Sequence, residues 1–199
     1  DPNKRALQAV VRAVESAGGV FTEIVADLAT GVGKTFLMSS LIEYLALQGV
    51  RHVLVVTPGS TIQRKTLANF DEASSKYVAG ADVAPYLVTP DNFQAASVGT
   101  VLRDPSRLKV FVFNVQQLLR PTANTSRRVR DYDENLGASL YEHLRSVEDL
   151  VIIADEHHSY FGPQFSRAVR DLSPQALIGL TATPHPKTDP AHIVFHYPL

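Results

Sequence analysis

The chain has 199 residues, of which 45% are hydrophobic and 20% charged, the balance of an ordinary globular domain. Nineteen basic and twenty acidic residues give a formal net charge of −1, which excludes nucleic-acid binding by bulk charge alone but allows a local patch. The absence of cysteine excludes a disulfide scaffold, a thiol nucleophile and a zinc site with cysteine ligands. Apolar runs are far shorter than a membrane span and no secretory leader is recognisable, so we expect a cytoplasmic protein with no membrane partner.

The first quarter of the chain predicts a helix, a strand, a turn and a second helix. Apolar residues three and four positions apart predict a helix that begins near Pro2 and stops before Gly18. Residues 21–28 follow as a strand and residues 29–33 as a turn of small residues. The second helix begins near Lys34 and is apolar over most of its circumference, so we expect it to be buried.

The rest of the chain alternates apolar runs with helical patterns. Continuous runs rich in β-branched residues predict strands buried on both faces at 52–57, 108–113, 150–154 and 176–181. Helices are predicted at 60–74, 114–119, 138–147 and 163–172. Residues 75–98 are less regular, and residues 193–199 read as a short extended tail.

This alternation predicts the fold class: α/β, with a mainly parallel central sheet, right-handed crossovers and helices on both faces. We expect one domain over residues 1–183. Residues 120–137 are polar and lack an apolar period, which predicts a flexible loop or excursion. Residues 184–199 are interpreted as the start of a linker.

A glycine-rich turn between the first strand and the second helix predicts a phosphate-binding loop. Glycine lets peptide N–H groups approach a polyphosphate closely, the helix N-terminus adds partial positive charge, and the lysine adds a full charge. The predicted ATP-binding residues here are Thr30, Gly31, Val32, Gly33, Lys34 and Thr35. The position five residues before Gly33, a glycine in the usual pattern, is Leu28. The alternative is a chance glycine-rich turn.

A second candidate element, Asp155-Glu156, follows the apolar run 150–154. Carboxylates at the carboxyl end of a buried parallel strand lie at the edge where α/β sheets bind ligands. Asp155, with the Thr35 hydroxyl, is the expected Mg²⁺ ligand, and Glu156 the expected base that deprotonates the attacking water. Taken alone, such an acidic pair is more often a helix cap, and the phosphate-binding loop favours the catalytic interpretation. The adjacent His157 and His158 could suggest a transition-metal site, but we do not expect one. Neighbouring residues on one chain rarely chelate one ion well, and the sequence shows no cysteine or obvious third ligand nearby.

In this order the motifs resemble those of the first motor domain of superfamily 2 helicases and translocases, a RecA-like P-loop domain of three layers. They are most similar to type III restriction enzyme Res subunits and related DEAD/DEAH-like proteins. Residues 27–35 (DLATGVGKT) resemble motif I, residues 155–158 (DEHH) motif II, residues 181–183 (TAT) motif III, residues 57–59 (TPG) motif Ia, residues 114–118 (NVQQL) a further strand-contacting motif, and residues 5–8 (RALQ) the upstream glutamine motif.

The resemblance implies a role for each matching residue, with ATP and Mg²⁺ as cofactors. Lys34 and Glu156 would be catalytic, and Gln8 with Arg5 would recognise the adenine. His158, Thr181 and Thr183 would couple the γ-phosphate state to domain movement. The implied nucleic-acid contacts are Thr57, Pro58, Gly59, Asn114 and Gln116. Turn and cap chemistry is an equally good explanation of these last residues.

The resemblance also implies partners. A second RecA-like domain of the same parent chain would supply an arginine that stabilises the transition state, so we expect this segment to hydrolyse ATP poorly by itself. The substrate would be nucleic acid, DNA rather than RNA, with a methyltransferase or specificity subunit in a restriction-type system. The alternative function is a nucleotide-dependent switch or binding module that does not act on nucleic acid.

Overall fold

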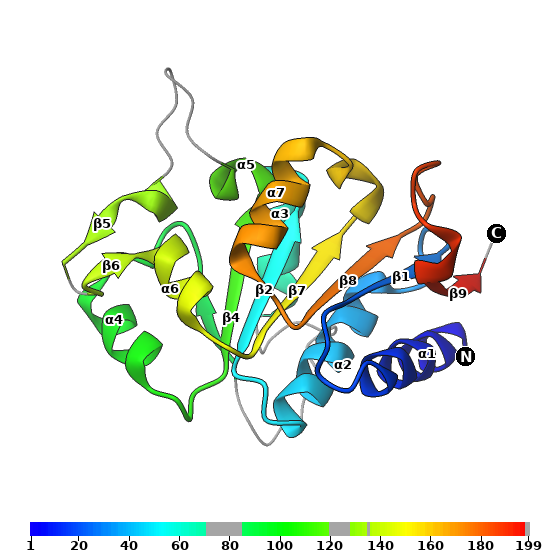
Figure 1. The fold of residues 1–199 in the computed structure, drawn as a ribbon, viewed down its shortest axis with the longest axis horizontal. Coiled ribbons are helices and arrows are strands. Elements are labelled where there is room, and N and C mark those ends of the chain that lie inside the picture. Colours follow the sequence, from blue (N-terminus) through cyan, green and yellow to red (C-terminus); the bar gives the residue numbers. More distant parts are fainter. Residues whose placement is uncertain (71–84, 120–127, 135, 198–199) are drawn as a thin grey trace.

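A computed structural model of the chain describes residues 1–70, 85–119, 128–134 and 136–197. Its centre is a seven-stranded sheet in the order β3-β4-β2-β7-β8-β1-β9, in which every neighbouring pair is parallel (Figure 1). The strands are β1 (Thr22–Leu28), β2 (His52–Thr57), β3 (Tyr86–Val88), β4 (Lys109–Asn114), β7 (Leu150–Asp155), β8 (Ala176–Thr181) and β9 (Ile193–Tyr197). A separate antiparallel pair consists of β5 (Tyr132–Asp133) and β6 (Ala138–Ser139).

Helices cover both faces of the sheet (Figure 1). The α-helices are α1 (Pro2–Ser16), α2 (Lys34–Leu47), α3 (Ser60–Asn69), α4 (Ala96–Arg103), α5 (Val115–Leu118), α6 (Leu140–Ser146) and α7 (Pro163–Leu172). Short 3₁₀ helices are η1 (Arg128–Arg130), η2 (His157–Tyr160) and η3 (Pro190–His192). In the part of the chain described above, no helix has the length and apolar character to cross a membrane.

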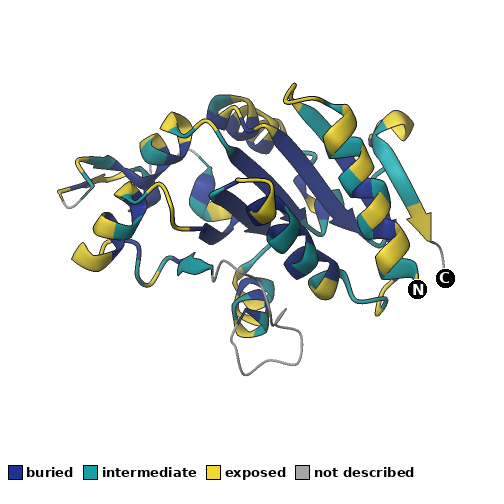
Figure 2. Cartoon of the chain, turned by 90° about the horizontal axis from the view of Figure 1, so that it is seen from below, coloured by how far each residue is buried: buried dark blue, intermediate teal, exposed yellow. Residues whose placement is uncertain are grey.

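Two hydrophobic cores, one on each face, explain why the central strands are apolar throughout. Successive side chains of a strand point to opposite faces. Val53 and Val55 of β2 accordingly pack with α1 and α2, whereas Leu54 and Val56 pack with α6 and α7. Figure 2 shows the central strands buried between the helical layers. The predicted α/β class with three layers is therefore confirmed.

The predicted bounds agree best with the observed ones for the strands that are buried along their whole length. The strands at 52–57 and 176–181 and the helix at 163–172 have the predicted bounds. The helix predicted at 60–74 ends early, since α3 ends at Asn69 with Phe70 as its C-cap; residues 71–74 lie outside the described residues. The helix predicted from Ala138 begins at Leu140, after the two residues of β6. The region 75–98, read as irregular, contains β3 and the start of α4 in its described part.

The segments 120–137 and 184–199, predicted as a loop and the start of a linker, contain helical turns and strands in their described parts. Within 120–137, residues 120–127 and 135 lie outside the described residues, while η1 and β5 are formed. Within 184–199, β9 extends the sheet beside β1, and His196 contacts the buried carboxylate of Asp27. A segment that pairs with the edge of the sheet can still lead into a linker. The predicted domain boundary near residue 183 therefore stays a prediction.

Candidate nucleotide-binding site

The loop between β1 and α2 has the backbone conformation that a phosphate-binding loop requires. Gly31 and Gly33 have φ angles of 84° and 101°, in the left-handed region that side chains disfavour. Gly33 is also the N-cap residue of α2, which begins at Lys34. The loop therefore lies at the positive end of the α2 dipole, where anions are stabilised.

The departure at Leu28 has a structural reason. Leu28 is the last residue of β1 and is fully buried in the core beneath α1 and α2. The position that carries glycine in the usual pattern thus belongs to the strand here. A glycine there would lose core packing, and the loop obtains its left-handed turns from Gly31 and Gly33 instead.

Asn3, at the start of α1, holds this loop and was missed by the sequence analysis. Its Nδ2 donates a hydrogen bond to the carbonyl oxygen of Val32 at 2.6 Å. A Cβ added to Gly33 would lie 2.9 Å from the same Nδ2, so glycine also allows this close approach. No local pattern marks Asn3, because its partner lies 29 residues away.

The two motifs with predicted chemistry meet at the carboxyl edge of the sheet. Lys34 Nζ donates to Glu156 Oε1 at 2.6 Å, which joins residues 122 positions apart. Glu156 follows β7 with a φ of 53°, a left-handed conformation that is strained for a residue with a side chain. Asp155 is partly buried, and burial together with the Glu156 charge raises the pKa of its carboxyl group.

The strand order explains how motif III reaches motif II. β8 lies between β7 and β1, so Thr181 ends beside both the acidic pair and the phosphate-binding loop. His158 Nδ1 lies 2.9 Å from Thr181 Oγ1, and Thr181 Oγ1 donates to the carbonyl oxygen of Thr183 at 3.2 Å. The ring of His158 is also 3.6 Å from Glu156 Oε2. The three predicted coupling residues therefore form one contact chain that ends at the acidic pair.

The predicted nucleic-acid contacts divide into accessible and internal residues. Thr57 is fully buried and donates to the carbonyl oxygen of Gly59 at 3.4 Å. Asn114 is 9% exposed and caps α5 in a capping box with Gln117. Gln116 is exposed, and Pro58 and Gly59 are half-buried. The side chains of Thr57 and Asn114 thus have internal partners, which leaves the other three accessible.

The predicted adenine-recognition residues lie on α1. Gln8 and Arg5 are both exposed. The guanidinium of Arg5 lies 5.9 Å from the centre of the Phe195 ring, so α1 and β9 are in contact at this point. The structure thus places the two residues at the surface of the helix that Asn3 joins to the phosphate-binding loop.

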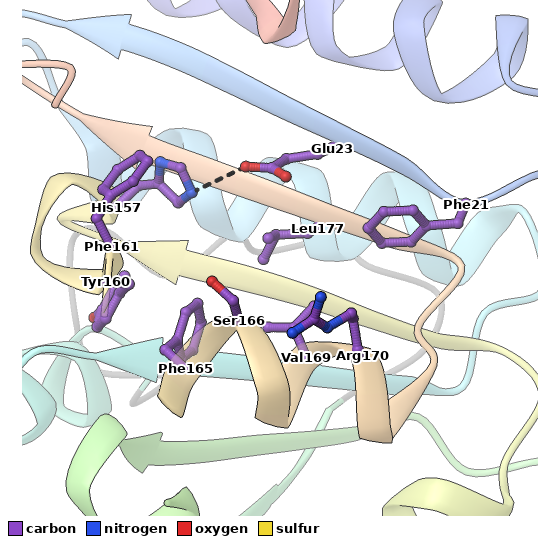
Figure 3. A pocket seen from close by; sticks show the side chains of 10 residues that line it. All are labelled: Phe21, Glu23, His157, Tyr160, Phe161, Phe165, Ser166, Val169, Arg170 and Leu177. Carbon is purple, nitrogen blue, oxygen red and sulfur yellow. Dashed lines mark ion pairs between the residues drawn. The ribbon is translucent and has the colours of Figure 1, made fainter. Parts of the chain in front are cut away.

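Behind the acidic pair, η2 packs closely on the sheet. A Cβ on Gly179 of β8 would lie only 2.5 Å from His157 Cγ, so the imidazole needs a glycine beneath it. His157 is 4% exposed, and burial lowers its pKa to about 4. Figure 3 shows it in a pocket of about 230 Å³, with Nε2 directed at Glu23 3.6 Å away. A glycine inside an apolar strand signals close approach, so Gly179 could have been found from the sequence.

The geometry fits a magnesium nucleotide. The loop offers glycine turns and Lys34 at a helix N-terminus, and the partly buried carboxyl of Asp155 provides the oxygen chemistry that Mg²⁺ prefers. The fold and the arrangement of these motifs define a helicase-type ATPase motor domain. The family model described as "Type III restriction enzyme, res subunit" matches residues 1–186. The chain therefore belongs to this family and is an N-terminal RecA-like domain of the superfamily 2 type.

The comparison with solved structures finds the Sulfolobus solfataricus SWI2/SNF2 ATPase core in complex with dsDNA. The identity is 19% and the TM-score 0.47, over 81% of this chain. The chain spans 28% of the length of that protein. The comparison with curated proteins finds no match.

Proposed function

We propose that this chain is the ATP-binding first lobe of a nucleic-acid-dependent ATPase that translocates on or unwinds DNA. The observation that carries the proposal is the contact of Lys34 Nζ with Glu156 Oε1 at 2.6 Å. It brings a phosphate-binding lysine and a candidate base to one point from motifs that the sequence places 122 residues apart. A structural ion pair would not also need a glycine loop at a helix N-terminus on one side and a carboxylate residue with a strained backbone on the other.

Within the site, each residue has a distinct task. The loop Thr30–Thr35 and the first turn of α2 would bind the phosphates, with Lys34 moving from Glu156 to the phosphate oxygens. Thr35 and Asp155 would hold Mg²⁺, which when bound neutralises charge on the phosphates. Glu156, released by Lys34, would orient and deprotonate the attacking water. Gln8 and Arg5 would recognise the adenine through their exposed polar groups.

We further propose that the loops at the same sheet edge bind the nucleic-acid backbone. Pro58, Gly59 and Gln116 are the accessible contacts, and Thr57 and Asn114 act by holding these loops in shape. Contacts of this kind position a strand without reading its sequence. The chain from His158 to Thr181 and Thr183 would transmit the γ-phosphate state to a second RecA-like lobe. A methyltransferase or specificity subunit would complete a restriction-type system.

The test is ATP turnover by the full-length protein with and without duplex DNA. Lys34→Ala should abolish turnover and weaken ATP binding, whereas Glu156→Gln should abolish turnover and leave binding largely intact. Gln164→Ala, an exposed change on α7, is the control and should behave as the unchanged protein. Turnover that neither DNA nor RNA stimulates would favour the nucleotide-dependent switch instead. Turnover retained in Glu156→Gln would remove Glu156 from the role of base.

A further inference from the structure

One hydroxyl group joins the ends of two neighbouring strands at the proposed site. Tyr160, in η2, is 4% exposed. Its hydroxyl oxygen lies 2.7 Å from the carbonyl oxygen of Asp155 and 3.2 Å from that of Val56. Asp155 ends β7, and Val56 is the penultimate residue of the adjacent strand β2. A phenol has a single hydrogen to donate, so the two carbonyl groups share it.

The ring of Tyr160 is fixed so that the hydroxyl must face these strand ends. It packs against Phe165 of α7 with the ring centres 4.8 Å apart, and Figure 3 shows the two rings close together at one side of the pocket. Burial raises the pKa of the phenol, and the charges of Asp155 and Glu156 raise it further. The hydroxyl is thus placed to donate to the carbonyl oxygens of Asp155 and Val56.

The peptide group between Asp155 and Glu156 is held by Tyr160. Its carbonyl oxygen, that of Asp155, accepts a hydrogen bond from the Tyr160 hydroxyl at 2.7 Å. Rotation of this one peptide changes ψ of Asp155 and φ of Glu156 together, so the hydrogen bond restrains the backbone that carries both carboxylates. Because Glu156 has a strained φ of 53°, such a conformation persists only where surrounding contacts enforce it.

We propose that Tyr160 is a positioning residue that orients the Asp155–Glu156 peptide for Mg²⁺ binding and ties it to the strand leading into residues 57–59. Because one hydroxyl bonds the ends of both strands, a shift of residues 57–59 on contact with nucleic acid would change the position of the Asp155–Glu156 peptide. The inference rests on the proposed function, but its first half concerns Mg²⁺ alone. The two halves can therefore be tested separately.

The test compares Tyr160→Phe with Tyr141→Phe. Tyr141 is a matched control, since it is 3% exposed in the same core and donates to the carbonyl oxygen of Ala168 at 3.4 Å, away from the strand ends. ATP affinity of the 199-residue chain is measured with EDTA and with Mg²⁺. In EDTA the variants should match the unchanged chain. With Mg²⁺, Tyr160→Phe alone should lose about 10-fold of the affinity gain, the usual effect of removing an outer partner of a metal ligand.

Two further measurements separate positioning from stability and from the proposed function. Replacing Tyr160 by 4-aminophenylalanine, which keeps a donor on the ring, should restore the Mg²⁺ effect. In the full-length protein, Tyr160→Phe should lower the stimulation of turnover by DNA more than the turnover without DNA. If DNA stimulates no turnover even in the unchanged protein, the proposed function fails while the Mg²⁺ result still decides the role of Tyr160. An unchanged Mg²⁺ effect in Tyr160→Phe, an equal loss in Tyr141→Phe or a loss that 4-aminophenylalanine does not restore would overturn the inference.

Discussion

Replacing Gly179 by alanine should displace His157, the residue that follows the acidic pair Asp155-Glu156, and destabilise the fold. The added Cβ would lie 2.5 Å from His157 Cγ and 2.8 Å from Cδ2, about 1 Å closer than the carbon–carbon contact distance of roughly 3.5–4.0 Å. Gly179 is paired with Val25 on one side and Ala154 on the other, so the strand cannot step away. The imidazole must move instead, and His157 is bonded directly to Glu156.

Two opposing terms determine the size of the effect. Overpacking a core costs about 1–3 kcal/mol. A glycine-to-alanine change without strain stabilises by about 0.4–1 kcal/mol through the unfolded chain, and the φ of Gly179 lies outside the left-handed region. The net expectation is a loss of about 1–2 kcal/mol. For a chain of this size that corresponds to a fall in Tm of roughly 2–8 °C.

Urea and thermal unfolding measure this change, and two comparisons locate its cause. Gly162→Ala adds a Cβ with no atom within 4 Å and should cost less. In a His157→Ala background the ring is absent and only the contact with the residue 157 Cβ, at 2.9 Å, remains. Gly179→Ala should therefore cost less there, and the difference between the backgrounds is the coupling energy. A Gly179→Ala protein as stable as the unchanged one, or an equal loss without the ring, would refute the packing argument.

Two other predictions concern protonation and capping. Burial lowers the pKa of His143 and of His157 from 6.5 to about 4, so between these values the unfolded chain binds two more protons than the native one. The free energy of unfolding should therefore fall as pH drops from 6.5 to 4, by up to about 2.7 kcal/mol per pH unit, and a flat urea-denaturation profile would contradict this. Asn114→Ala should cost about 1 kcal/mol by loss of its capping box, as should Ser139→Ala, with ATP affinity unchanged in calorimetry.

The sequence by itself determined the fold class and the main strands. Residues 52–57 are β-branched or aliphatic almost throughout, and only a strand buried on both faces accounts for that composition. The helix at 163–172 was equally well defined, because its apolar face is narrow and proline begins it. β3 and α4 have three and eight residues, too few for a period to stand out. The predicted end of the helix at 60–74 was wrong because no local signal marked Asn69 as its last residue.

The candidate site was also predicted from the sequence, since glycine turns, Lys34 and the acidic pair are local motifs. Only the tertiary structure decided which of these groups touch, because β8 separates the two strands that carry them and the partners are far apart along the chain. The same holds for Asn3, Gly179 and Tyr160, whose roles depend on backbone atoms of other segments. Every residue has a backbone carbonyl group, so the residue type of the partner does not indicate that it accepts such a hydrogen bond.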